Sequence, residues 1–227
     1  MAKRIPRRGT ALEPEEVLTW MQQLLAFAKH YQKWIMAGTL AVVLAAAAVQ
    51  VNAYLKRSRQ AEAAQALAQV RPKLDRPEEA AAATQALADL VKKYPGTPAA
   101  REAALYRAHL LYQGGKYEEA GRAYEELAAG LAGEPGLSAL VTESLSYCYE
   151  AQGKYPDAAR VLKPLADQAG GAFQGEVWRR LAYLHEKAGN SEEARRYWGE
   201  LLKKPPVPAM VPYIKEKLAG LEAPPKK

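Results

Sequence analysis

The stretch "WRRLAYLHEKAGNSEEARRYW", residues 178–198, carries the pattern from which the fold follows. It begins and ends with tryptophan, and between them lie a small residue, Ala182, a glycine, Gly189, and a second small residue, Ala194. Small side chains let two antiparallel helices approach closely, and glycine accommodates the positive φ angle of a tight turn. The stretch therefore predicts a helical hairpin.

The same pattern recurs along the chain at a spacing of 36 to 38 residues. Counted from Ala194, a small residue lies twelve positions earlier, a glycine five earlier and a large residue four later. The equivalent alanines are Ala83, Ala120, Ala158 and Ala194, and the large residues are Leu87, Tyr124, Leu162 and Trp198. In the last three units the small residues are Ala108, Ser146 and Ala182, and the glycines are Gly115, Gly153 and Gly189. Because one hairpin cannot bury its apolar face alone, we expect the hairpins to stack into a solenoid.

Composition agrees with an all-α fold, since Ala, Leu, Glu, Lys, Arg and Gln dominate and β-branched residues gather in one short window. The net charge is +7, but positive and negative residues are interspersed, and no dense basic stripe with interleaved aromatic residues occurs. This charge pattern is not typical of a nucleic-acid-binding protein. The single cysteine, Cys148, excludes an intrachain disulfide.

The last unit resembles the tetratricopeptide repeat. Its residues match the order of that signature: Trp178, Leu181, Ala182, His185, Ala194, Trp198, Leu201 and Pro206. The resemblance implies an all-α solenoid of about four helical hairpins. We expect the first hairpin to open with "RQAEAAQALAQV", residues 59–70, and a capping helix from about Pro208 to cover the last hairpin.

A second feature is "WIMAGTLAVVLAAAAVQVNAYL", residues 34–55, which contains no charged residue. As a helix these residues would extend roughly 33 Å, enough to cross the hydrocarbon core of a bilayer. Trp34 and Tyr54 lie at its two ends, where amphipathic rings prefer to sit in a membrane. The segment therefore predicts one transmembrane helix that is retained as an anchor.

Two other interpretations of residues 34–55 stay open. A buried core helix is one, although a soluble helix does not need an apolar surface all the way round. A cleaved signal peptide is the other, although the 33 residues that precede the segment are longer than a usual basic leader. No cysteine comes directly after the segment, which excludes a lipoprotein anchor.

The segment "EPEEVLTWMQQLLAFAKHYQKW", residues 13–34, predicts an amphipathic helix at the membrane surface or, alternatively, a partner-binding helix. Pro14 suits the first position of that helix. The expected organisation is an N-terminal arm at 1–33, the transmembrane helix at 34–55, the repeat domain with its cap at 56–221 and a disordered tail at 222–227.

The first helix of each hairpin is expected to line the concave side of the solenoid. Three register positions on these helices predict a groove that binds a protein or peptide, and His109, Tyr147 and Tyr183 occupy one of them in consecutive units. The nine candidate groove residues are Leu105, His109, Tyr112, Glu143, Tyr147, Glu150, Arg179, Tyr183 and Glu186. Partly buried packing residues without a ligand are an equal alternative, and a segment of the chain itself could also fill the groove.

The sequence offers little for catalysis. His109 and His185 fall at positions that the repeat explains, and Cys148 lies within a helix without a nearby cation to activate it. "GGK" at 114–116 lacks the strand and the Ser/Thr of a phosphate-binding loop. No His, Cys or Asp cluster has the spacing of metal ligands. We therefore predict a protein that is not an enzyme, with no cofactor, no metal and no small-molecule substrate.

The full layout resembles a bacterial family of single-span repeat proteins, the ancillary subunits of the SecYEG translocon. The span that leads directly into repeats carries this resemblance, together with "ARRYWGELLKKPPVPAMVPYIKEKLAGL" at 194–221. The resemblance implies an inner-membrane anchor, a cytoplasmic N-terminus, periplasmic repeats, and contacts with the translocon, periplasmic chaperones or secreted clients.

Two points stay open at this stage. Lys and Arg residues flank both ends of the span in near balance, so the charge pattern hardly decides its orientation. "YPGTPAA" at 94–100 also resembles envelope proteins of the cell-division coordinator and outer-membrane assembly type. An anchored scaffold for another envelope complex, in cell division, polysaccharide export or pilus assembly, is therefore the alternative.

Overall fold

The computed structural model describes residues 14–131, 133–167 and 174–222, and these residues form helices and turns without a strand. The chain divides into two compact units, residues 1–58 and 59–227. Residues 1–13 of the expected arm and 223–227 of the expected tail lie outside the described residues.

The N-terminal unit contains α1 (Pro14–His30) and the first part of α2 (Gln32–Val70), including the whole apolar segment 34–55. Pro14 is the first residue of α1, as its missing N–H favours. The side chains from 34 to 55 are exposed, apart from the half-buried Ala53. By length and hydropathy α2 is the one helix in the described part of the chain that could cross a membrane, and none of its most apolar window is buried. That exposure favours an anchor or a signal sequence over the core helix considered above.

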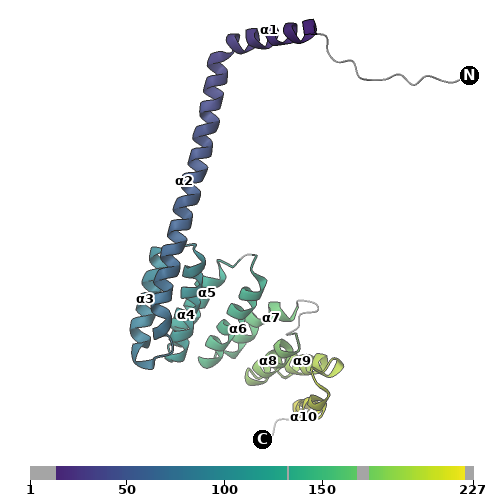
Figure 1. Ribbon diagram of the computed structural model, residues 1–227. Helices are drawn as coiled ribbons and strands as arrows, with labels where there is room; N and C mark the ends of the chain where they lie inside the picture. Colours follow the sequence, from purple (N-terminus) through teal and green to yellow (C-terminus); the bar gives the residue numbers. More distant parts are fainter. Residues whose placement is uncertain (1–13, 132, 168–173, 223–227) are drawn as a thin grey trace, which may run out of the picture. The chain divides into compact units, whose positions relative to one another are not determined.

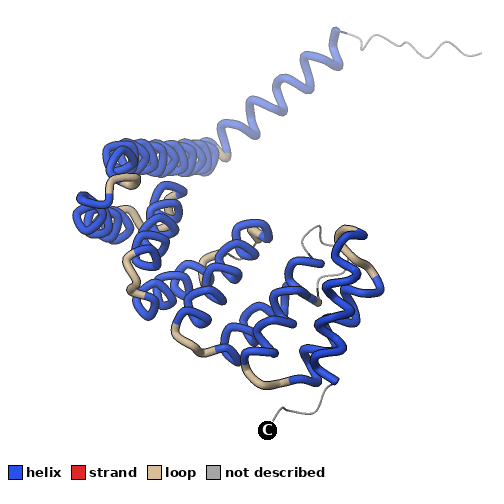
Figure 2. Tube along the Cα trace, turned by 90° about the horizontal axis from the view of Figure 1, so that it is seen from below, coloured by secondary structure: helices blue, strands red, loops and turns tan. Residues whose placement is uncertain are grey.

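The second unit is the expected series of helical hairpins (Figure 1). The end of α2 pairs with α3 (Ala80–Lys93) in one apolar cluster, and α10 (Val211–Glu222) follows the last hairpin. The three hairpins between them are α4 (Pro98–Gln113) with α5 (Tyr117–Ala128), α6 (Pro135–Ala151) with α7 (Tyr155–Ala166), and α8 (Gln174–Lys187) with α9 (Ser191–Lys203). From α3 to α10 each helix contacts the next, and Figure 2 shows the hairpins following one another along the unit.

The small residues lie where the register predicts. The four reference alanines and the small residues twelve positions before the last three of them have no exposed surface: Ala83, Ala120, Ala158, Ala194, Ala108, Ser146 and Ala182. Because these small side chains are already fully enclosed, the helix crossings have no room for longer ones. The expectation that these positions allow each pair of helices to nest is confirmed.

The turns between paired helices are also as predicted. Gly115, Gly153 and Gly189 have φ angles of 74°, 72° and 75°, in the region that side chains other than glycine rarely adopt. The first hairpin lacks this glycine and turns differently, through two 3₁₀ helices, η1 (Arg71–Lys73) and η2 (Pro77–Glu79). Each has proline among its first residues, which fixes φ and makes the longer turn possible.

The C-terminal cap begins where the sequence indicates. A 3₁₀ helix, η3 (Pro208–Met210), leads into α10, and Ile214 of α10 is fully buried against the last hairpin. Tyr213 lies edge-on to Trp198 of α9, with 5.7 Å between ring centroids. The cap therefore covers apolar surface that the final hairpin would otherwise expose.

Candidate functional site

The nine predicted groove residues all lie on the first helices of the hairpins, α4, α6 and α8, and none of them is fully buried. His109, Tyr147 and Arg179 are exposed. The other six are half-buried: Leu105, Tyr112, Glu143, Glu150, Tyr183 and Glu186. All nine positions are thus at least partly accessible, and three of them, Leu105, Tyr112 and Tyr183, also pack against the apolar clusters of the hairpins.

A compact polar cluster joins α6 to α8. The guanidinium carbon of Arg180 lies 3.4 Å from the centroid of the Tyr147 ring, and its Nη2 donates a hydrogen bond of 2.5 Å to Glu150. The Tyr147 hydroxyl lies 3.4 Å from the Glu143 carboxylate, to which it donates. Burial, and then Glu150, raise the pKa of Tyr183. Stacking and pairing together hold the Tyr147 ring in place with two-fifths of the residue exposed.

Arg180 organises this cluster, and the sequence interpretation missed it. The equivalent residues of the two preceding units are Tyr106 and Ser144, so the repeat gives no signal for a basic residue there. Arg179, the predicted neighbour, is exposed and pairs with Glu176 on its own helix. Arg180 therefore joins two of the predicted residues, Tyr147 and Glu150, although the prediction did not include it.

The side chains of Tyr112 and Glu186 contact side chains of other helices. The ring of Tyr112 lies edge-on to Tyr117 at 5.2 Å between centroids, and burial raises its pKa. The Glu186 carboxylate accepts hydrogen bonds of 2.5 Å from Trp198 Nε1 and 2.8 Å from Lys217 Nζ of the cap. Glu186 therefore fastens α10 to the last hairpin.

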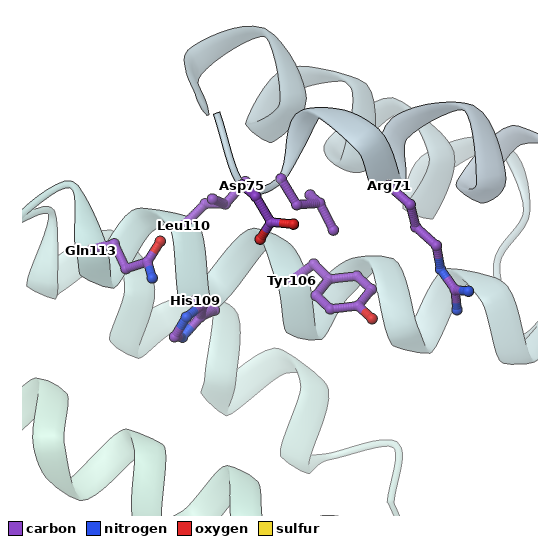
Figure 3. A pocket seen from close by; sticks show the side chains of 7 residues that line it. Arg71, Asp75, Tyr106, His109, Leu110 and Gln113 are labelled. Carbon is purple, nitrogen blue, oxygen red and sulfur yellow. The ribbon is translucent and has the colours of Figure 1, made fainter. Parts of the chain in front are cut away.

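At the other end, a pocket of about 480 Å³ lies between the first turn and α4 (Figure 3). Its lining residues are Arg71, Leu74, Asp75, Tyr106, His109, Leu110 and Gln113. Arg71 is paired with Glu102 at 2.5 Å, and the Tyr106 hydroxyl donates to the same carboxylate at 3.0 Å. His109 is the one predicted groove residue that lines this pocket.

Two of the residues considered above for catalysis, Cys148 and His185, are packed against other side chains. Cys148 is fully buried, and burial raises the pKa of its thiol to about 11, so the thiolate is scarce at neutral pH. His185 stacks on Tyr197 with 5.7 Å between ring centroids, and burial lowers its pKa. Within the described residues no group of three or more His, Cys, Asp or Glu side chains could hold a metal ion.

The repeat geometry agrees with comparisons to known proteins. A family model described as "Tetratricopeptide repeat-like domain" matches residues 26–223. The chain belongs to this family. No curated protein sequence matches the chain. Tetratricopeptide-like repeats generally serve as protein-interaction scaffolds and are typically not enzymes.

A solved structure shares the fold. A crystal structure of nearly identical TPR-like repeats from a putative kinesin light chain of Podosopora anserina has a TM-score of 0.50 and 16% identity, over 73% of this chain and 84% of that one. The structure of BtubC (BKLC) from P. vanneervenii has a TM-score of 0.40 and 18% identity, over 73% of this chain and 82% of that one. At such identities the likeness concerns the fold of this tetratricopeptide repeat-like protein alone.

Proposed function

We propose that this protein is a membrane-anchored interaction scaffold of the bacterial inner membrane. Residues 34–55 are its anchor, the N-terminus is cytoplasmic, and the repeat domain at 56–221 lies in the periplasm. There the repeats bind the protein translocon, together with periplasmic chaperones or secreted clients. The anchor is supported by the length, hydropathy and exposure of α2. The translocon is proposed on the resemblance given above.

The observation that carries the binding role is the Tyr147 ring. It is exposed on the first helix of a hairpin, yet it is held by the Arg180 guanidinium and the Glu143 carboxylate. An immobilised aromatic ring loses little conformational entropy when a partner binds, and tyrosine offers both apolar area and a hydroxyl. Tyr183 occupies the equivalent position of the next hairpin, so an extended or helical segment could contact both rings.

Protease treatment of spheroplasts tests the compartment. External protease should degrade residues 60–227 in intact spheroplasts, because the cytoplasmic membrane does not shield a periplasmic domain. A cytoplasmic reference protein in the same sample reports that the membrane stayed closed. Protection of the repeats until the spheroplasts are lysed would refute the periplasmic location and remove periplasmic partners from the proposal.

Site-specific photocrosslinking tests the partners. A photoreactive phenylalanine analogue at position 147 or 183 should give products that contain translocon subunits, chaperones or secreted clients. The same analogue at Arg122, an exposed residue of α5 on a second helix, is the control and should not give them. Products with division or export proteins alone would favour the alternative scaffold, and equal products from all three positions would refute the groove.

The double variant Tyr147→Ala with Tyr183→Ala gives a functional readout of the same surface. Both residues are partly exposed, so the helices should still form, and circular dichroism checks this. We expect weaker recovery of the crosslinked partners when the variant is captured under native conditions. Undiminished recovery would contradict the assignment of the two rings to the binding surface.

A further inference from the structure

The repeat register brings carboxylates to one equivalent position in three of the four units. Asp75, Glu150 and Glu186 each lie eight residues before the reference alanine of their hairpin. In the remaining unit the position is taken by Tyr112. The three carboxylates are equivalent by register, although Asp75 lies in the turn between η1 and η2, whereas Glu150 and Glu186 lie on α6 and α8.

Two of the three carboxylates are paired with a cation. Glu150 accepts from Arg180 of the next hairpin at 2.5 Å, and Glu186 accepts from Lys217 of the cap at 2.8 Å. Each cation comes from the element that follows along the solenoid. The arrangement shows that this site between successive units accommodates a basic side chain from outside the hairpin.

Asp75 has no such partner among the described residues. The register places Tyr106 where Arg180 stands two units later, and the Tyr106 hydroxyl donates to Glu102. Arg71 forms an ion pair with Glu102 as well, and in Figure 3 its side chain extends along the pocket away from Asp75. Among the described residues no Lys or Arg is paired with Asp75, which lines the pocket of about 480 Å³ together with the Glu102-paired Arg71.

The pocket lining fits a long basic side chain. Leu74 and Leu110 offer aliphatic surface to a methylene stem, and the rings of Tyr106 and His109 offer flat surface beside it. In Figure 3 the Asp75 carboxylate faces the side chains of α4, and Gln113, with a carboxamide oxygen that can accept a hydrogen bond, lines the same end of the pocket as His109.

We propose that this pocket binds an arginine or lysine side chain of the protein segment that occupies the groove, with Asp75 as its counter-ion. This inference deepens the proposed function and rests on it for the identity of the occupant as a protein. The partner's basic side chain takes the place that Arg180 and Lys217 fill within the chain at the equivalent positions.

Ligand-observed saturation-transfer NMR on the full chain in detergent tests the pocket. The probes are Nα-acetyl-arginine methylamide and Nα-acetyl-citrulline methylamide, which have nearly the same shape and differ in charge. We expect saturation transfer to the arginine compound and its loss with Asp75→Asn. The control is Asp89→Asn, the same substitution at an exposed residue of α3 outside the pocket, which should keep the signal.

The outcomes separate this inference from the proposed function. Equal saturation transfer to both probes, a signal that survives Asp75→Asn, or a signal that both variants abolish would each overturn the basic-side-chain pocket. If the crosslinks from positions 147 and 183 still form in that case, the groove stands without it. Preferential binding of the arginine compound in the absence of any such crosslink would support the pocket and overturn the proposed protein scaffold.

Discussion

The ammonium of Lys217 lies 2.8 Å from the carboxylate of Glu186, and this pair fastens the capping helix α10 to α8. Trp198 of α9 donates to the same carboxylate at 2.5 Å, so one acidic side chain joins three helices. The cap would otherwise depend on apolar contacts such as those of Ile214. The pair therefore contributes to closing the solenoid at its C-terminal end.

Glu186→Gln should reduce the stability of the repeat domain in a pH-dependent way. The hydrogen bond with Glu186 raises the pKa of Lys217, so the contribution is present below about pH 10.4, the ordinary lysine value, and is lost as the pH rises through the folded pKa. For this partly exposed pair we expect about 1 kcal/mol at neutral pH. Urea unfolding of the full chain in detergent, from pH 7 to pH 11, measures the difference from the unaltered protein.

The matched control for that pair is Glu200→Gln, which removes an exposed ion pair between Glu200 and Lys203, both on α9. Its effect should be close to zero throughout the pH range. A cost for Glu186→Gln that persists unchanged up to pH 11 would show that the loss does not arise from the Lys217 ammonium.

Arg180→Met should destabilise the repeat domain by about 1.5–3 kcal/mol, because Glu150 then loses its charged partner in a mostly buried place. Arg179→Met is the adjacent control. It removes an exposed pair between Arg179 and Glu176 within one helix, for which we expect about 0.3–0.5 kcal/mol. Equal unfolding midpoints for the two variants would contradict the role given to Arg180.

Ala182→Leu should force α8 and α9 apart, since Ala182 has no exposed surface. Overpacking of this kind typically costs about 1–3 kcal/mol. The same substitution at Ala128, an exposed residue of α5, should stay within about 0.5 kcal/mol of the unaltered protein. Thermal unfolding of the full chain followed by circular dichroism compares them, and an unchanged midpoint for Ala182→Leu would count against the register.

Two glycine substitutions should have effects of opposite sign. An added Cβ meets no atom within 4 Å at Gly189 or at Gly199, but only Gly189 has a positive φ, of 75°. Gly189→Ala should therefore cost about 1–2 kcal/mol, whereas Gly199→Ala within α9 should stabilise by roughly 0.5–1 kcal/mol. Urea unfolding of both variants checks the signs. Stabilisation by Gly189→Ala would mean that the turn does not need the left-handed backbone.

Much of the fold could be predicted from the sequence because its signals are local. A small residue twelve positions before Ala158 or Ala194 indicates a close helix crossing. This signal does not depend on which hairpins lie next to it. The φ of Gly153 is likewise set by the turn that it makes. The absence of charge from 34 to 55 is visible without coordinates as well. The turn through η1 and η2 was not predicted, because proline-led 3₁₀ segments do not repeat in the other hairpins.

The groove stays a prediction, and the side-chain contacts of its residues could not be predicted from the sequence. The register selects the face on which Tyr147 and Tyr183 lie, but it says nothing of which side chains pair across neighbouring hairpins. The contact between Arg180 and Tyr147 joins residues more than thirty positions apart, and the attachment of Lys217 to Glu186 joins the cap to a helix before the last turn. Periodicity alone carries no information about such partners.

The sequence by itself determined that the chain folds into stacked helical hairpins after an apolar helix, because helix crossings, turns and hydrophobic length depend on short-range residue order. Only the tertiary structure decided which of the three carboxylates at the equivalent register position pair with a basic side chain of the chain. Glu150 and Glu186 are brought next to Arg180 and Lys217, while Asp75 is left beside a pocket. Charge pairing depends on distances of a few ångströms between units, and these are set by how the hairpins pack.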